Sequence, residues 1–241
     1  MSFRYDDTYH CIDEPTIDLT ISLLYRLGGD IVTVLVGPRA TATRFFVHED
    51  LVSQHSDFFQ ARLKEGWRRA EERIVRLPAA SADAFMEFHS FLYTGKVYSI
   101  AEEESSKHKY KGEWARLESC WLLGNALLST SFKDAVVDSI LHRMVSTKSS
   151  PVGMCFSLHR HSLAGSPIRR LMIDIAVEDF SERYLAEKCS DVDMSFFQDL
   201  SVSLLKWKRQ PRTARSDDPR RKEGSCFYHE HGDKPCYKKM F

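Results

Sequence analysis

The chain has 241 residues, of which 43% are hydrophobic and 12% aromatic, so it can bury a sizeable core. Lys plus Arg and Asp plus Glu each number 34, which excludes a general charge preference for nucleic acid or for an anionic membrane. No apolar run approaches the roughly 18 residues that span a bilayer, and residues 1–15 lack the basic and apolar blocks of a secretory signal. We therefore expect an intracellular protein with no membrane association, in the cytoplasm, the nucleus or both.

The first predicted element is a short amphipathic helix over residues 17–27. Ile17, Ile21 and Leu24 fall on one helical stripe, and Gly28 follows where a left-handed C-cap belongs. A helix of this length is marginal without tertiary packing. Its apolar stripe therefore needs a surface to pack against, on its own domain or on a second copy.

Residues 30–37, with the sequence DIVTVLVG, and residues 43–48, with the sequence TRFFVH, predict a hairpin of two strands. The pattern turns helical over 49–65, and Ser56 is placed to cap a second helical segment there. A third short strand is predicted over 73–78, where a proline ends it.

Ser81 then opens a helix that stops at Tyr-Thr-Gly-Lys, and its apolar residues recur at three- and four-residue intervals. Those residues are Phe85, Phe88, Phe91 and Leu92. Residues 99–113 are polar without periodicity and indicate a loop, and helices are predicted over 114–128 and 132–146, the second capped by Ser131.

Amphipathic segments follow near 151–163, 167–188 and 195–208. In the last of these, one predicted apolar face consists of Phe197, Leu200, Leu204 and Trp207. The division that we expect is an N-terminal segment (1–28), a first domain (29–147), a helical extension (148–209) and a flexible basic tail with a Cys/His cluster (210–241).

This order of elements resembles the BTB/POZ family, and most closely its short fungal members. The residues that carry the resemblance stand in DIVTVLVG, in FFVHEDLVSQHSDFFQARL and in IVRLPAASADAFMEFHSFLYTGKV. The most specific are His48, Asp50, Ser56, Phe58, Phe59, Tyr93 and Gly95. The resemblance implies an α+β fold, with a small sheet capped by helical hairpins and followed by a C-terminal helical extension, and a protein interaction module that is not an enzyme.

The resemblance also implies that His48 and Asp50 fix the turn from strand into helix. Asp50 would sit in the first helical turn, where a carboxylate accepts bonds from unpaired backbone N–H groups and complements the helix dipole. The rival hypothesis is a His/Asp/Ser catalytic set, but residues crowded at one helix start rarely converge on one reacting atom. The chain has no Walker A, dinucleotide-binding or nucleophile-elbow motif.

Two association surfaces follow from the resemblance. The stripe of Ile17, Ile21 and Leu24 would form the seam of a two-fold dimer. Ile100-Ala101-Glu102 fits the pattern by which some family members recruit a cullin-type ubiquitin ligase scaffold, with Ile100 as an apolar anchor and Glu102 as a charged contact. The alternative for these residues is a solvated loop.

The six cysteines are scattered, and no disulfide framework is expected. Four read as buried thiols, whereas Cys226 and Cys236 stand with His229 and His231 in the arrangement Cys-x2-His-x-His-x4-Cys. These are four nitrogen and sulfur ligands of the types that zinc prefers, so a zinc site is predicted. The alternatives are unstructured residues, a disulfide, or a three-ligand site that a partner completes.

Residues 206–222 hold eight Lys or Arg and two Asp. Such a run suits a nuclear import signal, a weak nucleic-acid contact or a solvated linker, but no aromatic series interleaves it, so specific nucleic-acid binding is not expected. The function predicted is a non-enzymatic protein interaction module that self-associates and recruits protein partners. The alternatives are a cullin-type ubiquitin ligase adaptor and a transcription-associated nuclear factor.

Overall fold

The protein is described by a computed structural model that covers residues 29–64, 73–98, 109–188, 192–209 and 218–241. Its sheet has three strands in the order β2-β1-β3, formed by β1 (Ile31–Val36), β2 (Thr43–His48) and β3 (Ile74–Leu77). β1 and β2 form the predicted antiparallel hairpin, and β3 runs parallel to β1, with Val34 opposite Val75. Alternate residues of β1 are buried, as expected of a strand with one face on the core.

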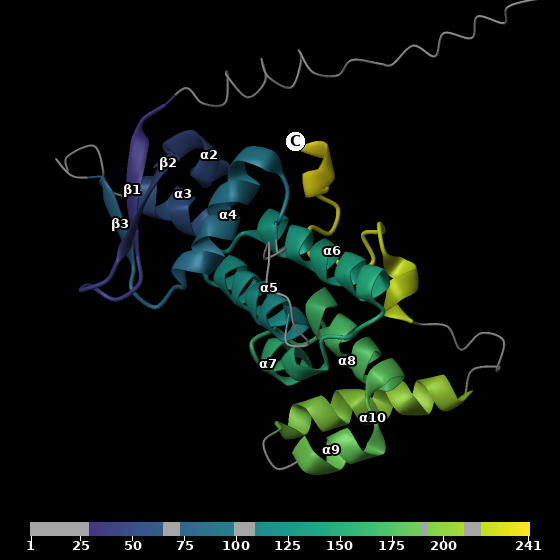
Figure 1. The fold of residues 1–241 in the computed structure, drawn as a ribbon. Helices are drawn as coiled ribbons and strands as arrows, with labels where there is room; N and C mark the ends of the chain where they lie inside the picture. Colours follow the sequence, from purple (N-terminus) through teal and green to yellow (C-terminus); the bar gives the residue numbers. More distant parts are fainter. Residues whose placement is uncertain (1–28, 65–72, 99–108, 189–191, 210–217) are drawn as a thin grey trace, which may run out of the picture.

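The helices that follow the strands cover one side of this sheet (Figure 1). They are α2 (Glu49–His55), α3 (Asp57–Lys64), α4 (Ala82–Thr94), α5 (Lys109–Ala126) and α6 (Thr130–Thr147). The Ser81 hydroxyl accepts a bond from the Ala84 backbone at 3.4 Å and caps α4, and Gly95 ends it in the left-handed conformation at φ 68°. α5 begins five residues before the predicted start. α6 begins at Thr130, so Ser131 lies within the helix and does not cap it.

An aromatic cluster joins α4 to α6. The ring centroids of Phe88 and Phe132 lie 5.1 Å apart, and those of Phe91 and Phe132 lie 5.3 Å apart. Phe85, Phe88, Phe91 and Leu92 are all fully buried, as the periodicity predicts. Aromatic pairs at such separations add to the free energy of burial, so they fix α4 to α6, and the Phe45–Phe85 pair at 4.8 Å fixes α4 to β2 of the sheet in the same way.

The C-terminal region is helical. It consists of the 3-10 helix η2 (Val152–Met154), α7 (Cys155–Arg160), α8 (Pro167–Asp179), α9 (Glu182–Lys188) and α10 (Met194–Arg209). The predicted segment 167–188 is thus two helices. The predicted apolar face of α10 is wrong in part: α10 buries Phe196 and Leu200, whereas Leu204 is 41% exposed. Phe196 is drawn inward because its ring packs on Phe156 at 4.7 Å.

Residues 218–241, which we call the strap, run along α6 on the side away from the sheet (Figure 1). They contain two short 3-10 helices, η5 (Pro219–Lys222) and η6 (Tyr237–Lys239). The sequence predicts a flexible tail here, but Tyr228, His229, Cys236 and Tyr237 are buried. The strap is ordered because polar groups of α6 and α8 bond to it.

The architecture is therefore α+β, with a small sheet, its covering helices and a helical C-terminal region. Within the described residues, none of the helices combines the length and the apolar character needed to cross a membrane.

Candidate functional site

The motif residues His48 and Tyr93 meet where β2 leads into α2. Nδ1 of His48 lies 2.9 Å from the Tyr93 hydroxyl near the end of α4, and the His48 backbone N–H donates to the same oxygen at 3.4 Å. Burial raises the pKa of Tyr93, although the bond from the His48 backbone acts in the opposite direction. Tyr93 is therefore a neutral hydroxyl that connects the end of β2 to α4.

Asp50 lies in the first turn of α2, where its charge complements the helix dipole. Its carboxylate lies against the backbone of Gly29, since a Cβ on Gly29 would be 2.8 Å from Oδ2. The neighbouring Glu49 faces a different group, the guanidinium of Arg73, at 3.0 Å. The two carboxylates thus serve two separate contacts.

Ser56 and His55 bond to the segment around the start of α6. The Ser56 hydroxyl donates to the carbonyl oxygen of Leu127 at 2.6 Å and accepts from the Phe59 N–H at 3.3 Å, which is the geometry of an N-cap for α3. Nδ1 of His55 lies 3.1 Å from the Ser131 hydroxyl. Both side chains are buried.

The polar residues of this junction therefore each bond to a different neighbour and do not converge on one cleft. The same holds for Cys155, His159 and His161. They stand in the arrangement Cys-x3-His-x-His, a spacing that could suit a metal. Cys155 donates to the Pro151 carbonyl, Nε2 of His159 lies 2.9 Å from Asp199, and Nδ1 of His161 donates to the Ser157 carbonyl. Burial raises the pKa of the Cys155 thiol well above its ordinary value. These groups contribute to packing.

The remaining motif residues belong to the core or to a helix end. Phe59 is fully buried, Phe58 packs against it at 5.4 Å, and Gly95 caps α4. The predicted dimer residues Ile17, Ile21 and Leu24 and the predicted partner residues Ile100 and Glu102 lie outside the described residues.

The strap brings the four predicted metal ligands together. The nitrogen and sulfur atoms of Cys226, His229, His231 and Cys236 all lie within 4.8 Å of one another. Sγ of Cys236 is 3.6 Å from Nδ1 of His229. Two ligands at zinc–sulfur and zinc–nitrogen bond lengths in a tetrahedral arrangement would be about 3.5 Å apart, so this pair is close to the spacing that a zinc ion requires.

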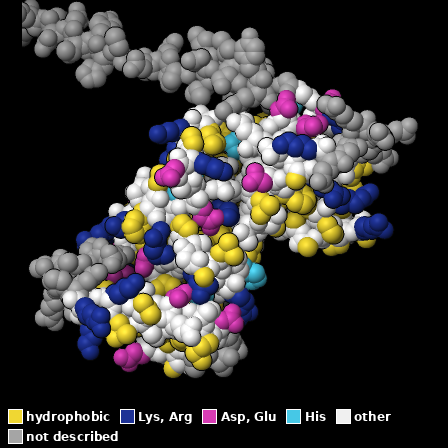
Figure 2. Space-filling model, turned by 180° about the vertical axis from the view of Figure 1, so that it is seen from behind, with side chains coloured by type: hydrophobic (Ala, Val, Ile, Leu, Met, Phe, Trp, Pro, Cys, Tyr) yellow, Lys and Arg dark blue, Asp and Glu magenta, His cyan; other side chains and the backbone are white. Residues whose placement is uncertain are grey.

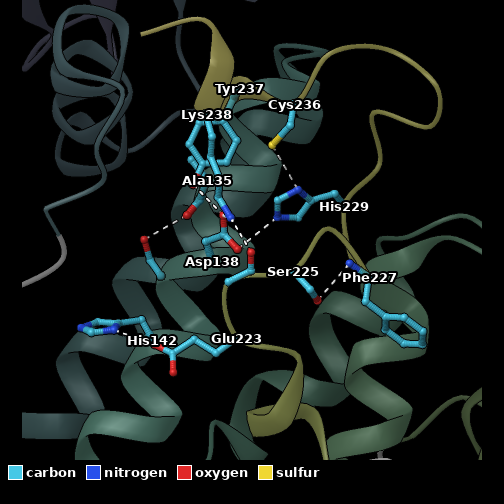
Figure 3. A network of polar contacts seen from close by, with 12 residues as sticks. Ala135, Asp138, His142, Glu223, Ser225, Phe227, His229, Cys236, Tyr237 and Lys238 are labelled. Carbon is cyan, nitrogen blue, oxygen red and sulfur yellow. Dashed lines mark hydrogen bonds and ion pairs between the residues drawn. The ribbon is translucent and has the colours of Figure 1, made fainter.

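The two histidines are held in suitable tautomers. Nε2 of His229 lies 3.1 Å from the Asp138 carboxylate of α6, so its proton is on that nitrogen and Nδ1 is free to face the sulfur (Figure 3). Nδ1 of His231 donates to the Gly232 carbonyl at 2.9 Å. Nε2 of His231 is buried and bonds to no group of the described residues. An unpaired buried nitrogen within this cluster fits a metal ligand.

Asp138 is the central polar residue beneath the cluster. It accepts bonds from the Tyr237 hydroxyl at 2.7 Å and from the Lys238 ammonium at 2.8 Å in addition to its contact with His229 (Figure 3). Burial alone would raise the pKa of Asp138, but the bonds from these three donors outweigh it and lower the pKa below its usual value. Asp138 is therefore an ionised acceptor.

A second carboxylate of α6, Asp134, holds the strap at Glu230, the residue directly before His231. Asp134 accepts from the Glu230 backbone N–H at 2.6 Å, and the Glu230 side chain pairs with Lys133. Burial raises the pKa of Asp134 to about 6, although the Glu230 N–H opposes the change. Sequence reasoning missed these partners. The signal was present, because Asp134, Asp138 and His142 recur every four residues along one face of α6.

The comparison with known protein families agrees with the strand and helix order described above. Residues 30–108 match the family model of the BTB/POZ domain. None of the curated proteins matches the chain. The match includes the whole sheet, α2, α3 and α4, with their His48–Tyr93 connection and the Ser56 cap. The chain therefore contains a BTB/POZ domain, followed by a helical C-terminal region.

Proposed function

We propose that the chain is a non-enzymatic protein interaction module that self-associates and recruits protein partners inside the cell, in the cytoplasm, the nucleus or both. The BTB/POZ domain belongs to a family of protein interaction domains. The observation that carries the proposal is the junction at α2, where His48, His55 and Ser56 each bond to framework atoms of other elements. Side chains engaged in this way support a fold and are not available to a substrate.

Self-association is tested by the molar mass of the full chain in light scattering. Ile21→Asp places a charge in the predicted apolar stripe, and Leu19→Asp places the same charge outside it on the predicted helix. We expect a dimer for the wild type and for Leu19→Asp, and a monomer for Ile21→Asp. A dimer mass for both variants would show that the stripe is not the seam.

A second candidate function is that of an adaptor for a cullin-type ubiquitin ligase. Two features favour it, the Ile100-Ala101-Glu102 pattern and the helical region from α7 to α10 behind the domain. A purified cullin scaffold should bind the wild type and lose binding with Ile100→Asp or Glu102→Lys. Glu104→Lys is the matched control, because it makes the same charge change two residues away in the sequence. Equal binding of all variants would exclude this surface.

The third candidate, a transcription-associated factor, rests on the basic run over 206–222 and has less support. Within that run, Arg220 pairs with Asp179 and Asp218, and Lys222 lies 4.7 Å from the Phe227 ring centroid. On the face drawn in Figure 2, basic side chains are interspersed with acidic ones. Nucleic acid binds best to a continuous basic surface.

We also propose that Cys226, His229, His231 and Cys236 hold one zinc ion. Two thiolates and two imidazoles favour zinc, and a structural zinc site supplies much of the folding free energy of its segment. Metal analysis of the full chain should give one zinc per chain for the wild type and none for Cys226→Ser/Cys236→Ser. His231→Gln should lower the zinc content, whereas His142→Gln should not. Equal zinc in all four proteins would exclude these ligands.

A further inference from the structure

The strap contacts three parts of the molecule in turn. Near its beginning, the Arg220 guanidinium pairs with Asp179 of α8 at 2.9 Å, and the Tyr228 hydroxyl donates to Asp174 of the same helix at 2.7 Å. Residues 229–238 then bond to α6. At its end, Phe241 reaches α4 and α2. The strap thus joins the helical region to the BTB/POZ domain.

Phe241 occupies an apolar recess between α2 and α4. Its ring stacks on His55 at 5.1 Å and meets Phe91 edge-on at 5.3 Å. It also covers Gly95, where an added Cβ would lie 2.5 Å from the Phe241 ring. His55 and Phe91 are almost fully buried with the strap in place. Without Phe241, part of both rings would face solvent.

The metal ligands lie between these two anchoring ends. The strap has little regular structure of its own, only the short helices η5 and η6. A segment of this kind loses much conformational entropy when it is held in one place. A metal that closes the eleven-residue loop from Cys226 to Cys236 would offset that loss.

Asp138 connects the ligand cluster to the end of the strap. Its Oδ1 lies 3.1 Å from Nε2 of His229, a ligand, and its Oδ2 contacts Tyr237 and Lys238, which directly follow the ligand Cys236 (Figure 3). A carboxylate that bonds to a ligating imidazole fixes its orientation. The same carboxylate fixes the residues that lead to Phe241. Tyr237 also forms one wall of a cavity of about 340 Å³ beside Gly95.

We propose that zinc binding at this cluster keeps the strap fastened across α8 and α6 with Phe241 seated on α4, and that loss of zinc releases residues 226–241 and uncovers the recess of His55, Phe91 and Gly95. The inference rests on the zinc site proposed above. Asp138 is a positioning residue in this device, since it acts through His229, Tyr237 and Lys238 and would not itself bind the ion.

Hydrogen exchange of the full chain tests the proposal, with zinc content measured on the same samples. The informative amides are those of Lys239 and Met240, which donate to the Cys236 and Tyr237 carbonyls, and that of Gly95, which donates to Phe91. At free zinc 100 times its dissociation constant, opening of the strap is suppressed about 100-fold, so chelation should raise exchange at Lys239 and Met240 by that factor. Readdition of zinc should restore protection, and magnesium should not.

The outcomes separate the two proposals. If zinc binds but chelation leaves exchange at Lys239, Met240 and Gly95 unchanged, the fastening role is wrong and the zinc site stands. If no zinc binds, the site and the fastening role both fail. A faster exchange on chelation that is confined to residues 226–236 also overturns the fastening role, because the recess then stays covered.

Two matched variants test Asp138. Asp138→Asn places an amide N–H₂ among three donors, so zinc affinity should fall roughly tenfold and the Lys239 amide should exchange faster even at saturating zinc. Asp179→Asn removes the carboxylate that pairs with Arg220, a contact that lies outside the ligand cluster. This variant should bind zinc with the affinity of the wild type. Equal zinc affinity and equal Lys239 exchange in the two variants would overturn the positioning role of Asp138.

Discussion

Gly95 provides the sharpest test of where the end of the strap lies. Its backbone has φ +68°, a conformation that costs an L-residue roughly 1–2 kcal/mol. The added methyl of Gly95→Ala would also lie 2.5 Å from Cγ of Phe241 and 2.8 Å from its Cβ. These atoms are close to the Phe241 backbone, so rotation of the side chain alone cannot make room. The strap would have to shift.

The expected cost therefore has two parts. The backbone contributes about 1–2 kcal/mol, and the collision with Phe241 adds about 1–3 kcal/mol, the usual range for overpacking. Gly165 is the matched control, because it has φ +76° and nothing within 4 Å of an added Cβ. Gly165→Ala should cost the backbone part alone.

The assay is urea unfolding of four proteins that form a double-mutant cycle, the wild type, Gly95→Ala, Phe241→Gly and the double variant. In the Phe241→Gly background, which also removes the Cβ at 2.8 Å, Gly95→Ala should cost only as much as Gly165→Ala does in the wild type. A coupling free energy of about 1 kcal/mol or more between the two positions is expected. The reasoning is refuted if Gly95→Ala costs the same with and without Phe241.

Three further predictions concern the framework. Ser56→Ala removes both the donor to the Leu127 carbonyl and the α3 cap, and should lower the free energy of unfolding by about 2 kcal/mol, or the thermal midpoint by about 4–8 °C. Glu113→Gln replaces the buried carboxylate that pairs with the Arg143 guanidinium of α6 by a neutral amide, and should lower the free energy of unfolding by about 1.5–3 kcal/mol in chemical unfolding. For His159, burial lowers the pKa although the hydrogen bond that it donates to Asp199 acts in the opposite direction, so the unfolded chain takes up the proton at a higher pH than the folded chain does. Stability should therefore fall as the pH drops below about 6.5, and His159→Asn should reduce that slope in thermal scans from pH 7.5 to 5.5.

Each of these has its own control. Ser201→Ala, at an exposed site on α10, should change stability by less than about 0.5 kcal/mol. Glu118→Gln, in the same helix as Glu113, should also change stability by less than about 0.5 kcal/mol. If Glu118→Gln and Glu113→Gln lowered stability equally, the pair of Glu113 with Arg143 would not be the cause. The charged neighbours Asp199, Arg169 and Asp193 also affect the pKa of His159. The assignment of this pH dependence to His159 is wrong if His159→Asn keeps the full pH dependence of the wild type.

The hairpin and α4 could be predicted from the sequence because local patterns determine them, whereas the fold class was implied by the resemblance to the BTB/POZ family. The alternation in β1 and the Ser81 and Gly95 ends of α4 are properties of short segments. The face of α10 could not be predicted in the same way. Phe196 and Phe197 each belong to a possible apolar face of this helix. Which of the two faces is buried depends on the contact of Phe196 with Phe156, which is distant in the sequence. The four candidate metal ligands of the strap could be identified from the sequence, whereas the contact of one of them, His229, with Asp138 could not.

The strap was predicted to be flexible because it has few apolar residues, and this reasoning omitted the polar face of α6. Asp134 and Asp138 recur one helical turn apart on a helix whose apolar face, with Phe132, Val136 and Ile140, fills the core. A carboxylate buried without donors would cost several kcal/mol, so these positions require donors from elsewhere. The strap supplies them through the Glu230 N–H and through His229, Tyr237 and Lys238.

The same carboxylates explain why α6 can tolerate release of the strap. Asp134 and Asp138 both lie against the strap and accept bonds from it, so release of the strap would open both carboxylates to water, and neither charge would remain buried without a partner. The recess around Phe91 has no such compensation, since exposing apolar rings costs free energy in proportion to their area. Docking of the strap therefore depends on two contributions besides its polar contacts with α6. One is the burial of the Phe241 ring in its recess, and the other is the metal ion that would close the ligand loop. Removing either one should loosen the strap while α6 itself remains folded.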